Sequence, residues 1–215
     1  MLDVHAPEGG IHGWRGLLTH LFVITLGLLI ALALEGGVEW IHHRHLAREA
    51  RAELRTEFEE NEKLLRKMTD AIPEQKKLAE QNLAAFDEVK GRAPDVHFNV
   101  TIDVWPPLSH SAWDTARETG AFEYMDYREV DSYATLVDME NEFMIHLDRL
   151  THAYSHGTTV EDRLKQVSAG GSKQDINATA DQGTGYLLDV ESELQMCEWM
   201  GTRLKDQYDV VLGKQ

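Results

Sequence analysis

The hydrophobic and polar positions of this chain change from an unbroken apolar run near the start to a helical periodicity further on. Residues 17–34 read LLTHLFVITLGLLIALAL and contain no Asp, Glu, Lys or Arg. At about 1.5 Å per residue this run covers about 27 Å of helix, close to the ~30 Å hydrocarbon thickness of a bilayer. The pattern predicts a transmembrane helix over residues 17–40, preceded by an N-terminal tail and interfacial segment over residues 1–16.

Tryptophans mark both ends of the predicted span. Trp14 and Trp40 stand 26 residues apart, or about 39 Å along a helix, which suits anchors in the two headgroup layers. Two alternatives fit less well. A signal peptide needs a basic region before the apolar run, and Arg15 is the only Lys or Arg there. A core helix needs neighbours around its whole circumference, which one small domain hardly supplies.

Small residues recur at four-residue spacing within the span. Gly27 with Ala31 forms one such pair, and Ala33 with Gly37 forms another on a neighbouring face. Such pairs let two membrane helices approach closely. Gly and Ala are also common in membrane helices without any such role, so both interpretations stay open.

Beyond residue 40 the apolar residues recur every three or four positions, as on one face of a helix. The first stripe consists of Leu46, Ala50, Leu54, Phe58, Asn61, Leu65, Met68 and Ile72. No Gly or Pro stands between Trp40 and Ile72, so we expect the membrane helix to continue into the following domain. Pro73 is expected to kink or end it.

Two more long helices are predicted in the second half. Asp126 and Glu129 have the spacing of a capping box, and the helix that they begin is expected to close at Gly157. Its stripe consists of Val130, Tyr133, Val137, Asn141, Met144, Leu147, Thr151 and Tyr154. The stripe of the last helix has heptad spacing and consists of Leu187, Val190, Leu194, Cys197, Gly201, Leu204, Tyr208 and Val211.

The sequence therefore predicts an all-α protein. One transmembrane helix continues into an antiparallel helical bundle of three to four long helices, which forms a soluble domain over residues 41–215. Polar residues and glycines indicate a flexible loop near residues 168–185. Heptad seams can also face another subunit, so self-association as a homo-oligomer is expected.

Charge excludes one class of partner. The formal net charge is −16, and residues 93–215 carry 9 basic against 22 acidic side chains. Nucleic-acid binding depends on clustered Lys and Arg, so no nucleic acid is expected. Cys197 is the only cysteine, which excludes an intrachain disulfide.

Histidines are the main candidates for metal chemistry. Glu39 and His42 have the Glu-x-x-His spacing of di-iron bundles, and His43 and His45 stand beside them. A di-iron site needs a second such pair, which the chain lacks, so we interpret these histidines as a polar collar at the headgroup level.

Two further pairs lie in the predicted helix after Asp126. His152 and His156 stand four residues apart but bring no third ligand, and Glu142 with His146 is expected to be a surface ion pair. The sequence has no Gly-x-Ser-x-Gly elbow and no phosphate-binding glycine loop. We expect no catalytic residue, no cofactor site and no metal site.

Aromatic side chains gather in the sequence around a short predicted helix. They either line a ligand pocket or cap one end of the bundle core. The cluster consists of Trp105, Trp113, Phe122, Tyr124 and Tyr127.

Three stretches resemble a known group of proteins. VITLGLLIALALEGGVEW at residues 23–40, with DVHAPEGGIHGW before it and HHRHLAREAR after it, is similar to bacterial single-pass inner-membrane proteins of unknown function. SAWDTARETGAFEYMDY at residues 111–127 resembles a segment that recurs in the same group. The resemblance implies an inner-membrane location and a periplasmic domain, because lysines before the span are common in that group. This chain departs from the group by having only Arg15 there, and its arginines after the span favour a cytoplasmic domain.

The expected function follows from the architecture. The main hypothesis is a non-enzymatic, membrane-anchored interaction protein that self-associates or serves a larger membrane complex. The alternative is a sensory or ligand-binding module that couples a pocket in the bundle to the membrane helix.

Overall fold

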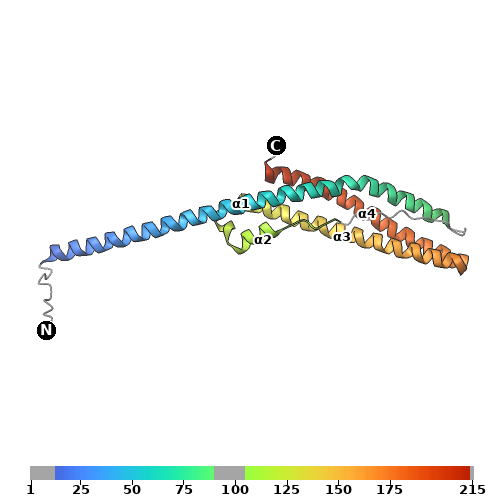
Figure 1. Ribbon diagram of the computed structural model, residues 1–215, viewed down its shortest axis with the longest axis horizontal. Coiled ribbons are helices and arrows are strands. Elements are labelled where there is room, and N and C mark those ends of the chain that lie inside the picture. Colours follow the sequence, from blue (N-terminus) through green and yellow to red (C-terminus); the bar gives the residue numbers. More distant parts are fainter. Residues whose placement is uncertain (1–12, 90–104, 214–215) are drawn as a thin grey trace, which may run out of the picture. The chain divides into compact units, whose positions relative to one another are not determined.

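The structure is a computed structural model that describes residues 13–89 and 105–213, and its regular structure there is entirely helical (Figure 1). The prediction of an all-α chain is confirmed. The helices are α1 (Trp14–Val89), α2 (Ser111–Glu118), the short 3₁₀ helix η1 (Ala121–Tyr124), α3 (Tyr127–Gly170) and α4 (Lys173–Leu212). Residues 1–12 of the predicted N-terminal tail lie outside the described residues.

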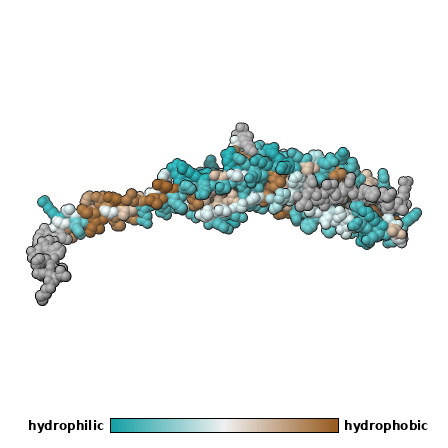
Figure 2. Space-filling view, in the orientation of Figure 1, coloured by the Kyte–Doolittle hydropathy of each residue, from teal (hydrophilic) through white to brown (hydrophobic). Residues whose placement is uncertain are grey.

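The chain divides into two compact units, residues 1–49 and residues 50–215, with the boundary inside α1. In the first unit, hydrophobic side chains cover much of the surface of the apolar part of α1 (Figure 2). Every large hydrophobic side chain from Leu17 to Ile41 is at least 44% exposed. Within the described residues, α1 is the one helix long and apolar enough to cross a membrane.

In the second unit, α1 and α3 run in the same direction. Arg51 bonds to Glu129, and Asn61 bonds to Glu140, so the partner on α3 stays 78 or 79 residues ahead. The bond between Gln75 and Tyr154 again has an offset of 79. The prediction of an antiparallel bundle therefore does not describe this pair.

Helix α4 runs against α3, and the two lie side by side (Figure 1). His146 of α3 bonds to Glu193 of α4, whereas the earlier Ser132 bonds to the later Gln207. Only Gly171 and Ser172 connect the two helices.

The prediction of a flexible loop near residues 168–185 was wrong. Helix α3 continues through Gly157 to Gly170, and α4 starts at Lys173. Ser172 accepts a hydrogen bond from the Asp175 amide and the Asp175 carboxylate accepts one from the Ser172 amide, a capping box that starts α4 within one turn. Pro73 was expected to kink or end the first helix; it lies inside α1 and so does not end it, and the kink stays a prediction.

A glycine in the supposed loop has a packing role instead. A Cβ atom at Gly183 would lie 2.3 Å from Cε1 of Phe86, a ring that is 1% exposed. At Gly201 a Cβ would similarly lie 2.4 Å from Cγ2 of Thr69. Both glycines on α4 therefore let α1 approach closely.

Most predicted core positions are buried. On α1 the buried stripe includes Leu54, Phe58, Asn61, Leu65, Met68 and Ile72, and on α4 every predicted position is buried except Val211. On α3 the predicted positions Val137 and Tyr154 are buried, but between them the buried face falls one residue earlier than predicted. Glu140 and Phe143 are fully buried, and Asn141 is exposed.

We predict that Gly183→Ala destabilises the chain by about 1–2 kcal/mol, because the added methyl must displace a rigid, buried ring. Gly185→Ala is the matched control, since nothing lies within 4 Å of its Cβ position. Gly185→Ala should stabilise by about 0.5–1 kcal/mol through helix propensity alone. Denaturant unfolding of the full chain in detergent, followed by circular dichroism, measures both. Equal effects at the two glycines would contradict the close approach.

Candidate functional site

The second unit contains a cluster of polar side chains between its helices. Glu57 and Asn61 come from α1, Ser109 and His110 precede α2, Glu140 comes from α3 and Tyr208 from α4. We call these six residues the polar cluster. Glu57, Asn61, Glu140 and Tyr208 are all at most 7% exposed.

Glu57 caps the start of α2 from another helix. Its Oε2 accepts hydrogen bonds from the hydroxyls of Ser109 and Ser111 at 2.8 and 2.9 Å, and from the Ala112 amide at 2.9 Å. Its Oε1 accepts a bond from the Trp113 amide at 3.3 Å. Helix α2 has no side-chain cap of its own. A carboxylate at this end also matches the positive end of the helix dipole.

Asn61 joins α1 to both neighbouring segments. Its amide nitrogen donates to the Ser109 carbonyl at 2.8 Å and to Oε1 of Glu140 at 3.0 Å, while its Oδ1 accepts from the Ser109 amide at 2.9 Å. Asn61 thus makes three bonds through one side chain. The sequence stripe placed Asn61 correctly in the core but gave no reason for a polar residue there.

Glu140 is fully buried and collects donors from three sides. Besides Asn61, the Tyr208 hydroxyl donates to Oε1, and Nε2 of His110 lies 3.0 Å from Oε2. The hydrogen bond with Glu140 raises the pKa of His110, and the nearby charges of Glu57 and Asp114 add to the increase. Burial, together with Glu140, raises the pKa of Tyr208, so the phenol stays protonated.

The polar atoms of the polar cluster bond to other atoms of the protein. Within the described residues, every buried side-chain nitrogen and oxygen has a hydrogen-bond partner. No three His, Cys, Asp or Glu side chains of those residues converge as metal ligands. A ligand at the polar cluster would have to replace bonds that the protein already makes. The arrangement therefore orders helices and offers no free nucleophile or base at its buried carboxylates.

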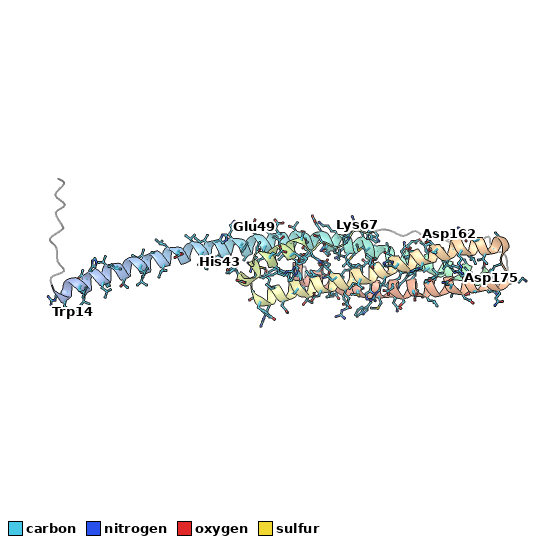
Figure 3. All side chains as sticks on the ribbon, turned by 90° about the horizontal axis from the view of Figure 1, so that it is seen from below. Trp14, His43, Glu49, Lys67, Asp162 and Asp175 are labelled. Atoms are coloured by element: carbon cyan, nitrogen blue, oxygen red, sulfur yellow. The ribbon has the colours of Figure 1, made fainter. Side chains whose placement is uncertain are left out.

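The predicted interface tryptophans lie at the expected ends of the apolar segment. Trp14 is the first residue of α1 (Figure 3), and both Trp14 and Trp40 are more than half exposed. The small residues Gly27, Ala31, Ala33 and Gly37 are exposed too. Nothing in the described chain lies within 4 Å of a Cβ at either glycine.

The aromatic residues that could line a ligand pocket or cap the bundle core have different surroundings. Trp113 and Phe122 pack with their ring centres 4.6 Å apart, whereas Tyr127 is 80% exposed. Trp105 lines a separate cavity of about 40 Å³ between α1, α3 and α4, with Tyr154 and Cys197 in its wall. Burial raises the pKa of the Cys197 thiol to about 12, so the thiolate is not available near neutral pH.

The predicted histidine pairs find other partners. His146 bonds to Glu193 on α4 at 2.6 Å, so its expected pairing with Glu142 was wrong. His152 lies 3.6 Å from Asp148, and His156 stacks on Tyr186 with ring centres 5.1 Å apart. In the collar, His43 lies 3.9 Å from Glu39 and His45 lies 3.5 Å from Glu49.

Sequence reasoning missed the three residues that give the polar cluster its charge, namely Glu57, His110 and Glu140. Glu57 stands one position before Phe58 of the predicted stripe, and Glu140 one position before Asn141. Both therefore lie one position off the predicted stripes, so periodicity did not select them. The available signal was Asn61, because a polar residue at a core position needs buried partners.

Comparison with protein-family models, with curated proteins and with solved structures gives no match to this chain.

We predict that stability falls as the pH rises from 6 to 9, to an extent that depends on His110. A pKa raised in the folded state means that the proton on His110 stabilises folding fully below about pH 6.5, the ordinary value. This contribution disappears as the pH rises through the higher folded value. Unfolding free energies of the wild type and His110→Gln, measured across this range, should converge at high pH. A constant difference would contradict the pairing.

A second prediction concerns the donors of Glu140. Tyr208→Phe removes a bond to a fully buried carboxylate and should cost about 2–3 kcal/mol. Tyr154→Phe is the matched control, because its hydroxyl donates at 3.0 Å to the neutral Oε1 of Gln75 and should cost about 1 kcal/mol. Chemical denaturation of both variants tests the difference. Equal losses would show that Glu140 does not depend on the Tyr208 hydroxyl.

Proposed function

We propose that this protein is a membrane-anchored helical protein whose function is interaction and not catalysis. In this proposal residues 17–40 cross a bilayer once, and the following helices form an α-helical bundle in which α4 is antiparallel to α1 and α3. The observation that carries the proposal is the exposure of the apolar part of α1. Large hydrophobic side chains there are 44–73% exposed. Soluble proteins rarely expose a continuous apolar surface of this size to water.

Three features support the bilayer as the medium that covers this surface. The apolar run has the length of a hydrocarbon core. Trp14 and Trp40 are exposed at its two ends, where indoles favour the headgroup layer. Gly27 and Gly37 are open to a close neighbour, which supports self-association or packing against another membrane protein.

The location is proposed from the resemblance of residues 23–40 to bacterial single-pass inner-membrane proteins. It supports an inner-membrane anchor with the helical domain in the periplasm. The inward-directed polar cluster, whose carboxylates are bonded to neighbouring helices, is in keeping with a non-enzymatic role.

The alternative is a sensory or ligand-binding module, and it has less support. The cavity beside Trp105 measures about 40 Å³, whereas small-molecule sites usually enclose about 300–1,000 Å³. The aromatic residues that suggested a pocket do not converge on one point. We therefore favour the interaction protein.

Membrane insertion is tested by charge in the span. Leu26→Arg combined with Leu29→Arg should move the full chain from the membrane pellet to the soluble or degraded fraction after alkaline extraction. Each arginine costs about 2.5–3.5 kcal/mol at the centre of an inserted helix. Val210→Arg is the control, because Val210 is an exposed apolar residue on α4 and should leave the pellet unchanged. Extraction of the wild-type chain by alkali would overturn the anchor.

Self-association is tested at the glycines. Gly37→Ile should lower the crosslinked dimer of the full chain in native membranes several-fold, because the side chain prevents close helix approach. Gly36→Ile is the control on a different face, and its Cβ position is equally open. A wild-type chain that never crosslinks to itself or to a neighbour would contradict the interaction role.

A further inference from the structure

Trp40, Arg44 and Arg48 form a row along one side of α1, just after the apolar run. They stand four residues apart, so each lies about one turn beyond the last. The guanidinium carbon of Arg44 lies 5.1 Å from the Trp40 ring centre, a cation–π contact. All three side chains are exposed.

Acidic residues of the same stretch face histidines and not these arginines. Glu39 lies 3.9 Å from His43, and Glu49 lies 3.5 Å from His45. Within the described residues, no carboxylate oxygen lies within 4 Å of Arg44 or Arg48.

Arginines further along α1 behave differently. Arg51 forms a bidentate ion pair with Glu129, with hydrogen bonds of 2.7 and 2.8 Å. Arg55 bonds to Glu59 at 3.1 Å. Arg66 bonds to Glu62 at 2.6 Å. Arg44 and Arg48 thus differ from the next three arginines, because neither forms an ion pair with another residue that the structure describes.

A phosphodiester matches this arrangement. Two guanidinium groups about 6 Å apart along the helix can donate to the oxygens of one phosphate. Trp40 holds Arg44 at the boundary between apolar and polar surface, which is the depth of lipid phosphates. An anionic headgroup is favoured over a zwitterionic one, because choline brings its own cation to the phosphate.

We propose that Trp40, Arg44 and Arg48 bind the phosphodiester of an anionic phospholipid and hold α1 at a fixed depth in the bilayer. This inference rests on the proposed membrane insertion. The occupant is a lipid and not a free anion, since the site combines an exposed indole with two cations at the edge of the apolar surface.

The experiment measures lipids retained by the full chain. Wild type is reconstituted in nanodiscs of equal phosphatidylglycerol and phosphatidylcholine, released, and weighed by native mass spectrometry. We expect enrichment of bound phosphatidylglycerol, and a decrease of about fivefold per arginine in Arg44→Gln/Arg48→Gln. Arg128→Gln/Arg203→Gln is the matched control. It removes the same charge and includes an arginine stacked on an exposed tryptophan, Trp199, at 4.9 Å.

Each outcome has one meaning. Equal retention of the two lipids, or equal loss in the two double variants, would overturn the lipid site. Displacement of phosphatidylglycerol by millimolar inorganic phosphate would identify a free-anion site and also overturn it. Alkaline extraction of the same samples distinguishes failure of the lipid site from failure of the membrane anchor. A chain that resists extraction but shows no lipid preference contradicts the lipid site only. A chain that alkali extracts contradicts the membrane anchor as well.

Discussion

The buried carboxylate of Glu140 is the constraint on which the arrangement of the second unit depends. A fully buried charge that lacks partners costs several kcal/mol, far more than a misplaced apolar contact. Asn61, His110 and Tyr208 supply its donors from α1, from the segment before α2 and from α4. Apolar layers tolerate a shift along the helix axis, because one aliphatic side chain can replace another. The donors of Glu140 cannot be exchanged in this way, so the carboxylate selects one register among those that the stripes permit.

Bonds from other residues of α1 also hold the parallel pair of α1 and α3. Ser109, just before α2, is bound to α1 by Glu57 and Asn61. The Arg51 contact with Glu129 fixes the first turn of α3 at the same end. Asp126 starts α3 by accepting from the Arg128 amide. Glu129 is therefore free of the capping role that its spacing suggests and instead joins two helices.

Sequence patterns predicted the helices that can be recognised from the placement of apolar residues along the chain. The apolar run, the stripe from Leu54 to Ile72 and the heptad seam of α4 each follow from helical periodicity. Two of the errors share a cause, which is that a residue type was given its average role. Gly183 falls within the predicted loop, but its missing side chain makes room for Phe86. Glu140 lies one position before Asn141 of the predicted stripe, and three donors from distant segments make its burial tolerable. Such donors are not adjacent in sequence, so periodicity alone cannot reveal them.

The first unit poses the opposite problem, because its helix has apolar surface and no protein to cover it within the described chain. Fully burying a Leu, Ile, Val or Phe is worth about 1.5–3 kcal/mol. Leaving more than a dozen of them in water therefore costs more than the roughly 5–15 kcal/mol that keeps a typical domain folded. We therefore propose that an apolar medium covers the run. A protein partner would place no requirement on its length or its ends. A bilayer requires a span of about 30 Å, indoles at its borders and cations just beyond, and Trp14, Trp40, Arg44 and Arg48 stand where those requirements fall.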